Sequence, residues 1–206
     1  MKKEKNSFNY YKVFKPFGML SQFTVEGNHQ SLASLKKFPE DVYPVGRLDH
    51  DTEGLLLLTN NTSVNHLLLD PKFERKKTYW VQIEGEMNED AMQQLQKGVV
   101  INLKGTMHQT KPTQVKNISS PKIPERNPSV NYLKHPVNSW IELTITEGKN
   151  RQVRKMTAKV GHPTLRLIRC AIEAISIEGM KSGEVVEMNE EDFFTLLQLR
   201  KESLKK

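Results

Sequence analysis

The chain of 206 residues is long enough to bury a substantial core in one domain or two small subdomains. Its 31 Lys and Arg against 24 Asp and Glu give a net charge of +7, which suits a polyanionic partner without requiring one. The single cysteine excludes an internal disulfide, and scattered histidines without paired cysteines argue against a structural zinc site. No apolar stretch approaches the ~20 residues of a membrane-spanning helix, and the N-terminus lacks the apolar segment of a secretory signal, so we predict a cytoplasmic protein without metal or membrane contacts.

The N-terminal segment contains one clear strand signal. Residues 1–7 are mostly polar, and we predict a disordered lead there. Residues 10–15 have a strand-forming composition, and Pro16 ends the predicted strand. Farther along, Ser31 is a candidate cap for a short helix that extends to Lys37.

The run of four leucines at 55–58 is the strongest structural signal in the chain. It is short, wholly apolar and soon followed by two asparagines, which is typical of a strand buried on both faces, although periodicity alone does not exclude a buried helical segment. The loop 46–52 before it is polar, and a rigid strand with a polar loop at one end is a suitable mount for a catalytic group. Local chemistry alone favours an ordinary surface turn in which Arg47 pairs with Asp49 or Asp51.

Helix and strand signals alternate after the leucine run. A helix capped by Asn61 or Thr62 is predicted first. Residues 78–84 alternate between apolar and polar side chains, as in a half-buried strand. A second helix over 90–97 and a strand over 99–103 follow.

The stretch from 108 to 139 differs from the rest of the chain in composition. It contains five prolines among many Lys, Asn and Ser residues. We predict a long Pro-rich loop or weak hairpin, mobile and solvated, with an isolated strand signal at 130–133.

The following region, 140–169, has a concentrated positive charge. Residues 140–146 predict a strand, and a helix is expected to begin near Arg151 with Asn150 as its cap. Basic side chains fall on the helix face opposite its apolar stripe: Arg151, Lys155 and Lys159, with Arg154 at the edge. The whole basic cluster comprises Lys149, Arg151, Arg154, Lys155, Lys159, Arg166 and Arg169. This cluster is a candidate for contacts with a polyanion.

The C-terminal part completes the predicted fold. Strands are expected over 165–168, 171–177 and 183–188, followed by a helix from Asn189 whose first turn is acidic, as the helix dipole favours. Residues 201–206 form a basic tail. Strands and helices alternate irregularly and without an internal repeat, so we predict an α+β fold with a mixed, largely antiparallel sheet and flanking helices.

Residues 46–60 contain a motif that resembles a known family. Gly46-Arg47-Leu48-Asp49, followed by Thr52, Gly54 and the leucine run to Asn60, is similar to the central motif of one family of ribosomal pseudouridine synthases, which comprises type A of the small ribosomal subunit together with types B, E and F of the large one. The aspartate of the family's Arg-Leu-Asp triplet is its catalytic nucleophile. The resemblance therefore implies that role for Asp49.

Further segments resemble other motifs of the same family. Lys15-Pro16-Phe17-Gly18 is similar to a turn beside its active site. Lys77-Thr78-Tyr79 is similar to a motif whose tyrosine packs against the target base, which implies this role for Tyr79. Residues 147–154 resemble a motif whose last basic residue pairs with the catalytic aspartate, which implies Arg154. On pattern alone, Tyr79 is a core strand residue and Arg154 a solvated helix charge.

The resemblance also implies roles for residues outside these motifs. Leu167 corresponds to an aliphatic residue beneath the uracil, although its pattern alone is that of a core strand. Arg47 is expected to hold the backbone or to fill the space left by a flipped nucleotide. The expected RNA contacts are Arg151, Lys155, Lys159 and Lys15.

The architecture implied by the resemblance is two subdomains around a central active-site cleft, in a catalytic domain that spans 8–200. Other members often carry a small N-terminal S4-like RNA-binding domain, which we do not expect here because few residues precede the first motif. The expected absence of that domain and the sequence of residues 15–24 resemble the E subgroup. We expect a monomer without cofactor or metal, because the reaction includes neither a redox step nor phosphate activation.

Pseudouridine formation breaks the N1–C1′ bond of a uridine, turns the base and joins its C5 to C1′. Asp49 must remain ionised, and a nearby guanidinium favours this. Whether its carboxylate attacks the sugar, attacks the base or removes a sugar proton stays open. Extruding a uridine from folded RNA costs roughly a few kcal/mol, which phosphate contacts can offset. By resemblance, the substrate is one uridine of the 23S RNA of the large ribosomal subunit, in a stem-loop or partly unfolded precursor.

Two other functions are compatible with parts of the sequence. A non-catalytic RNA-binding or ribosome-assembly protein on the same fold would share the basic cluster. A glycosidase would use Asp49 and Asp51 as its carboxylate pair, but no sugar-stacking aromatic residue neighbours them. The combination of Asp49, Tyr79 and Arg154 favours the synthase.

Overall fold

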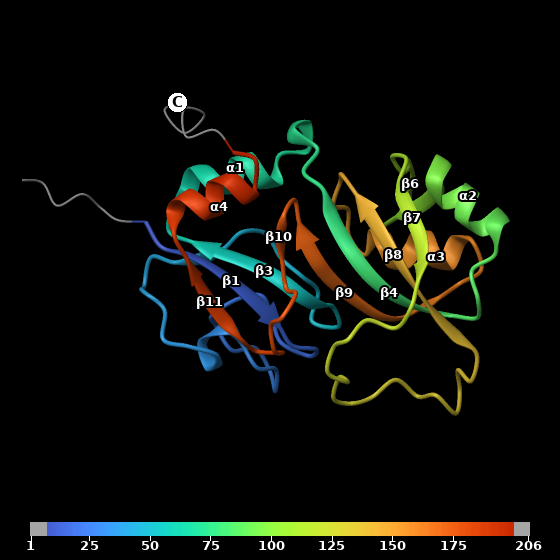
Figure 1. The fold of residues 1–206 in the computed structure, drawn as a ribbon, viewed down its shortest axis with the longest axis horizontal. Coiled ribbons are helices and arrows are strands. Elements are labelled where there is room, and N and C mark those ends of the chain that lie inside the picture. The colour runs from blue at the N-terminus through green and yellow to red at the C-terminus, as the bar shows by residue number, and fades with distance from the viewer. Residues whose placement is uncertain (1–7, 200–206) are drawn as a thin grey trace, which may run out of the picture.

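One mixed β-sheet with helices packed against it organises the polypeptide in the computed structural model, which describes residues 8–199 (Figure 1). The predicted lead at 1–7 and tail at 201–206 lie outside the described residues. The strands of the main sheet are β1 (Tyr10–Lys15), β2 (Tyr43–Pro44), β3 (Glu53–Thr59), β4 (Lys77–Glu84), β7 (Gln114–Ile118), β8 (Asn138–Ile145), β9 (Thr164–Ile172), β10 (Ile175–Ser176) and β11 (Val185–Met188). The hairpin of β5 (Val100–Leu103) and β6 (Thr106–Gln109) is separate.

The sheet has two halves, each covered by its own helices. Its order is β11-β1-β3-β9-β4-β8-β7, with β2 paired to β3 and β10 to β9. In Figure 1, α1 (Thr62–Leu69) and α4 (Glu190–Leu196) lie over the β1–β3 half, whereas α2 (Glu89–Lys97) and α3 (Gln152–Lys159) lie beside the β4–β8 half. Neighbouring strands pair antiparallel except β3 and β9. The predicted fold class, α+β with a largely antiparallel mixed sheet, is confirmed.

The leucine run forms the central strand β3, as predicted. Leu55 and Leu57 pack into a core with α1 and α4, while Leu56 and Leu58 pack into a second core with Met19 and other N-terminal residues. All four side chains are fully buried. Because side chains alternate along a strand, a wholly apolar run is what burial on both faces requires.

The two halves of the sheet join at a short parallel contact between β3 and β9. Only Glu53 with Ile168 and Gly54 with Arg169 form this register. Gly54 has φ +106°, and a Cβ there would lie 2.3 Å from the backbone oxygen of Arg169. Glycine is therefore required, because no other residue permits this approach of the two backbones.

The cap predicted for α1 and the acidic helix start predicted at Asn189 are both found. The side chain of Asn61 accepts a hydrogen bond from the Ser63 N–H at the start of α1. The side chain of Asn189 accepts one from the Asp192 N–H at the start of α4, whose first turn is acidic. Both caps satisfy helix N–H groups that have no partner within the helix.

Two other predicted caps are wrong. The Ser31 hydroxyl donates to the Phe23 oxygen instead, and only the 3₁₀ turn η1 (Leu32–Ser34) forms in place of a helix to Lys37. Asn150 does not cap α3: the residue before α3 is Arg151, in the left-handed region with φ +51°. The Gln152 side chain accepts from the Lys149 N–H and closes this turn.

The strands predicted at 165–168 and 171–177 are instead the single long strand β9 and the short β10. Arg166 and Arg169 interrupt the apolar pattern of β9, and the pairing of β9 with β4 shifts its register beside each of them, between Gln82 and Ile83 and between Thr78 and Tyr79. The predicted loop 108–139 includes the end of β6, the edge strand β7 and the start of β8. Its 130–133 segment is not a strand.

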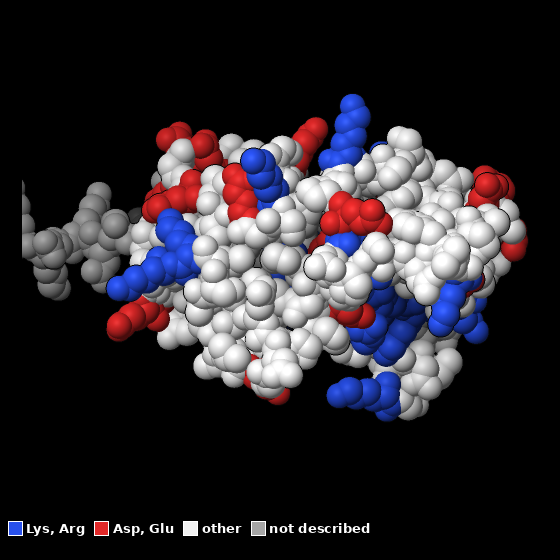
Figure 2. Space-filling model, turned by 90° about the horizontal axis from the view of Figure 1, so that it is seen from below, with Lys and Arg blue, Asp and Glu red and all other residues white. Residues whose placement is uncertain are grey.

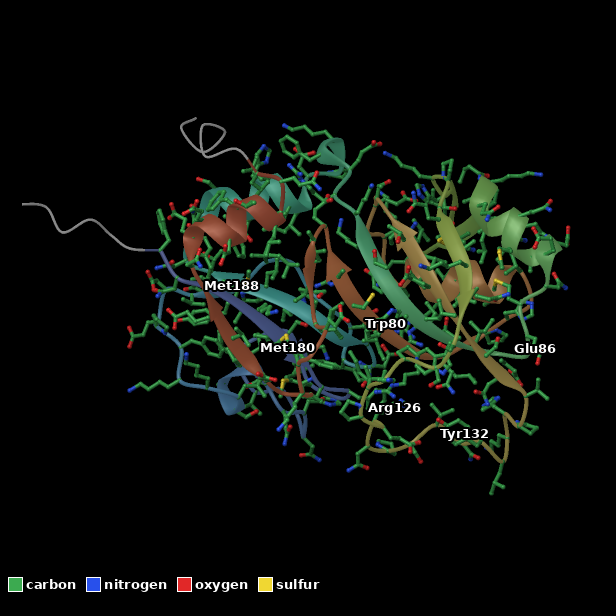
Figure 3. The ribbon with its side chains drawn as sticks, viewed as in Figure 1. Trp80, Glu86, Arg126, Tyr132, Met180 and Met188 are labelled. Carbon is green, nitrogen blue, oxygen red and sulfur yellow. The ribbon has the colours of Figure 1, made fainter. Side chains whose placement is uncertain are left out.

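The remaining loop, 119–137, is attached to both halves of the sheet. The Pro124 oxygen accepts a hydrogen bond from Arg166 of β9, and the Arg126 guanidinium lies 4.2 Å from the ring centre of Phe17. Figure 3 shows Arg126 nearer the middle of the molecule and Tyr132 farther out beneath the β4–β8 half. The second 3₁₀ turn, η2 (Pro71–Phe73), links α1 to β4.

Candidate active site

A cavity of about 560 Å³ lies where the two halves of the sheet meet. Its walls come from the loop before β3, the end of α1, the starts of β4 and α3, the end of β8, and β9. Five predicted site residues line it: Arg47, Asp49, Tyr79, Arg151 and Leu167. Segments more than 100 residues apart in the sequence thus contribute to one cavity.

The loop that carries Asp49 is hydrogen-bonded to the turn after β1. The Ser21 hydroxyl donates to the Leu48 oxygen at 2.8 Å and accepts from the Leu48 N–H at 3.0 Å. The Gly18 N–H donates to the His50 oxygen at 2.7 Å, and the Thr52 N–H donates to the Asp49 oxygen at 3.0 Å. These backbone contacts fix where the Asp49 side chain begins, which a reacting group requires.

Lys15 supports this loop from inside the protein. Its side chain is fully buried, and its ammonium donates to the backbone oxygens of Pro16 and Met19 and lies 3.5 Å from that of His50. Burial lowers the pKa of Lys15 to about 8. The prediction that Lys15 contacts RNA is therefore wrong, because its ammonium faces backbone oxygens inside the protein.

The arginine beside Asp49 is Arg151. Its Nη1 lies 3.6 Å from Asp49 Oδ2, and both side chains are 40% exposed. Arg154, the predicted partner, instead donates from Nη2 to the Asp51 backbone oxygen at 2.7 Å and lies 3.4 Å from Asp51 Oδ2. The predicted Arg154–Asp49 pair is thus corrected to Arg151–Asp49. The left-handed turn at Arg151 orients its side chain toward the loop, while Arg154 lies one helical turn deeper.

Asp51 is fully engaged with these two arginines. Its two oxygens accept hydrogen bonds from Arg151 at 3.0 and 2.8 Å. Burial alone would raise the pKa of Asp51, but the Arg151 hydrogen bonds and the charges of Arg154 and Arg151 hold it below its usual value. An ionised carboxylate cannot act as a general acid, so Asp51 could serve only as the ionised member of a glycosidase pair.

Tyr79 and Leu167 form a buried part of the cavity wall on adjacent strands. In the antiparallel register of β4 and β9, Tyr79 pairs with Arg169 and Val81 with Leu167. Their side chains are only 8% and 5% exposed, and both belong to the core of the β4–β8 half. Each is therefore a core residue and a cavity residue at once. An aromatic ring beside an aliphatic group is a suitable surface for a planar base.

Other predicted residues divide between the cavity and the surface. Arg47 is exposed at the cavity wall. Lys155 and Lys159 lie on α3 outside the cavity, and within residues 8–199 neither forms an ion pair or side-chain hydrogen bond. Arg166 and Arg169, two members of the predicted basic cluster, are only 6% and 5% exposed. They are not surface contacts for RNA.

A hydrogen-bond network that was not predicted from the sequence holds the far wall of the cavity. The buried Glu147 carboxylate accepts from the Lys111 N–H at 2.9 Å and from the Gln152 side chain at 2.7 Å, and lies 3.1 Å from His108 Nε2. Burial would raise the pKa of Glu147, but these hydrogen bonds keep it low. The network ties β6 to the start of α3. The sequence feature that could have indicated this network is the position of Glu147, four residues before Arg151.

The described residues contain neither a helix that could cross a membrane nor a group of three or more His, Cys, Asp or Glu side chains placed to hold a metal ion.

Comparisons with known proteins identify the family of this chain. Residues 9–159 match the family model described as RNA pseudouridylate synthase. The chain belongs to this family, whose members convert uridine in RNA to pseudouridine.

Several curated relatives bear more specific names. A ribosomal large subunit pseudouridine synthase E from Xanthomonas campestris pv. campestris is 44% identical over 173 residues, covering 82% of this chain and 90% of the relative. Its namesake from Vibrio parahaemolyticus is 43% identical, covering 84% and 71%. A ribosomal large subunit pseudouridine synthase B from Bacillus subtilis is 31% identical, covering 91% and 71%. A crystal structure of a pseudouridylate synthase superposes with a TM-score of 0.75 at 24% identity, covering 92% and 74%, and shares the fold.

Proposed function

We propose that this synthase converts one uridine of large-subunit ribosomal RNA to pseudouridine, with Asp49 as the catalytic nucleophile. The observation that supports Asp49 most is its position: a partly exposed carboxylate on the wall of the cavity, 3.6 Å from Arg151, with Tyr79 and Leu167 in the same wall. The names of the E and B relatives support the choice of ribosomal RNA.

The reaction requires a carboxylate that stays ionised near the sugar or the base. Arg151 places a positive charge 3.6 Å from the Asp49 carboxylate. The Asp51 carboxylate accepts a hydrogen bond from Arg151, and Arg154 in turn donates to the Asp51 backbone oxygen. These contacts give the Arg151 guanidinium a defined place. Attack on C1′, attack on C6 and removal of a sugar proton all use the same carboxylate, and each remains compatible with this position.

The cavity has room for a nucleotide turned out of its helix. Its volume of about 560 Å³ lies within the range of roughly 300–1,000 Å³ that small-molecule sites occupy. Lys155 and Lys159 are free to contact phosphates beside it. Seen from below, Lys and Arg side chains gather in a hollow of the β4–β8 half (Figure 2). Positive charge of this kind offsets the cost of unstacking the uridine.

The experiment compares Asp49→Asn with the wild-type protein on ribosomal RNA from a strain that lacks the gene. Pseudouridine is mapped at nucleotide resolution, and RNA binding is measured separately. We expect a loss of at least about a thousandfold in rate, because the nucleophile is removed, with RNA binding retained. Asp90→Asn is the matched control, since Asp90 is exposed at the start of α2, outside the cavity.

Normal turnover by Asp49→Asn would refute the nucleophile assignment. A wild-type protein that binds the RNA but forms no pseudouridine in it would favour the non-catalytic RNA-binding alternative.

A further inference from the structure

Arg169 is a buried cation in the cavity wall whose hydrogen-bonding capacity is largely unused. Its Nε donates to the Leu55 oxygen at 2.8 Å, whereas its Nη2 is buried without a hydrogen-bond partner. The side chain is 5% exposed, and within residues 8–199 it forms no ion pair. A buried guanidinium left unsatisfied in this way is costly, so a partner that arrives with the substrate is a physical explanation for it.

Lys77 is a second cation of the same cavity. It is the first residue of β4, two positions before Tyr79, and its ammonium donates to the Arg75 oxygen at 3.0 Å. Burial, and then the nearby charge of Arg169, lowers the pKa of Lys77 to about 8. The two positive charges therefore lie close enough to influence each other.

Acidic groups of the cavity are committed elsewhere. Asp49 lies beside Arg151, Asp70 pairs with Lys72, and Glu147 is held by the network with His108 and Gln152. Glu173, the one acid that raises the pKa of Lys77, accepts a hydrogen bond from the Lys76 N–H at the surface. Neither cation is neutralised by a carboxylate at hydrogen-bond distance within the described part of the chain.

We propose that Arg169 and Lys77 bind the carbonyl oxygens of the target uracil and stabilise the negative charge that the base acquires when it is detached. This inference rests on the proposed function. Arg169 pairs with Tyr79 across the strands and lies two residues after Leu167 on the same face of β9. The two cations thus adjoin the surface on which the base is proposed to lie.

The charge arises from the bond changes themselves. When the N1–C1′ bond breaks, its electron pair stays on the uracil and spreads over N1, O2 and O4. After the base turns, C5 forms the bond to C1′ and loses its proton, while N1 gains one, so the reaction is an isomerisation overall. Attack on C6 likewise places charge on O4. Each of the three routes open to Asp49 therefore benefits from cations at the carbonyl oxygens.

The test is a single-turnover comparison of Arg169→Gln and Lys77→Met with the wild-type protein, using RNA that carries uridine, 2-thiouridine or 4-thiouridine at the target. We expect each variant to lose roughly a hundredfold in rate on uridine, with little change in RNA affinity, because the interaction strengthens as charge develops. Sulfur accepts hydrogen bonds poorly and stabilises the anion by itself. The loss should therefore shrink on the thio-substrate whose replaced oxygen the residue contacts.

Lys97→Met is the matched control, because Lys97 lies at the exposed end of α2, outside the cavity. It should react like wild type. Circular dichroism and thermal unfolding verify that each variant is folded. If Arg169→Gln does not fold, the rates of Lys77→Met on the three RNAs decide the outcome, because Lys77 is only half-buried. A loss that is equal on all three RNAs would overturn the inference in favour of a structural role, as would wild-type rates in both variants. Absence of pseudouridine in the wild-type reaction would overturn the proposed function itself, and the inference with it.

Discussion

Two arginines of β9, three residues apart and on opposite faces of the strand, are equally buried but very differently paired. Arg166 binds Glu53 through two hydrogen bonds of 2.8 and 2.7 Å and also donates to the Pro124 oxygen. Arg169 has one hydrogen bond, to the Leu55 oxygen. Arg166 thus has a carboxylate partner within the protein, whereas Arg169, on the face toward the cavity, has none among the described residues.

The difference separates a structural charge from a functional one. A buried ion pair must recover the cost of removing two charges from water, and Arg166 does so with three short hydrogen bonds, two of them to Glu53. In the cavity wall, Arg169 retains hydrogen-bonding capacity that the folded protein does not use. At Arg169 this unused capacity coincides with the wall of the cavity, which makes it a candidate contact for a substrate.

The largest expected effect is a difference in stability between matched substitutions of these two arginines. Arg166→Gln leaves the Glu53 carboxylate buried without its partner, and we expect it to cost about 3–5 kcal/mol in the free energy of unfolding. Arg169→Gln removes one hydrogen bond and no ion pair, so about 1 kcal/mol is expected. Urea unfolding measures both. Equal losses would contradict the distinction between the two faces.

The next effect concerns the arginine that lies beside Asp49. Arg151→Met removes that charge and the bidentate contact to Asp51, so we expect the single-turnover rate to fall roughly a hundredfold. Arg151→Lys should lose less, because a positive charge remains while the two-pronged geometry is lost. A wild-type rate for Arg151→Met would show that Asp49 does not depend on this guanidinium.

A smaller effect is expected in acid. The pKa of Asp51 is lower in the folded protein than the ordinary value of 3.8, so its ionised form stabilises the fold above that value. That contribution is lost as the pH falls below 3.8 and through the lower folded pKa. We therefore expect the stability difference between wild type and Asp51→Asn to be constant above about pH 5 and to shrink below pH 4. Unfolding measured across this range tests it, and a constant difference down to pH 2 would contradict it.

The smallest effect is expected at the surface of α3. Lys155→Gln and Lys159→Gln should each weaken RNA binding modestly and reduce the slope of log affinity against log salt by about one at most. Lys97→Gln, at the exposed end of α2, is the control and should leave the slope unchanged. An unaltered slope in both α3 variants would remove these lysines from the phosphate contacts.

The sequence was a good guide to features that depend on near neighbours. The leucine run specified β3, Asn61 and Asn189 specified helix starts, and the motif around Asp49 indicated the family that the comparisons then showed. A buried strand or a cap is decided within a few residues, so its pattern is visible in the amino-acid sequence. Tyr79 and Leu167 were likewise predicted, and the structure brings both to the cavity.

Pairing between distant residues was decided only by the tertiary structure. The sequence could not show that Arg151 rather than Arg154 lies beside Asp49, about a hundred residues away, nor that Lys15 faces inward. Nor could it distinguish Arg166 from Arg169, since both are arginines in one strand and differ only in what the two faces meet. The amino-acid sequence determined the central strand, two helix starts and the motif around Asp49 that indicates the family. The fold determined which charges are satisfied, because that depends on the approach of β3 to β9 that Gly54 permits.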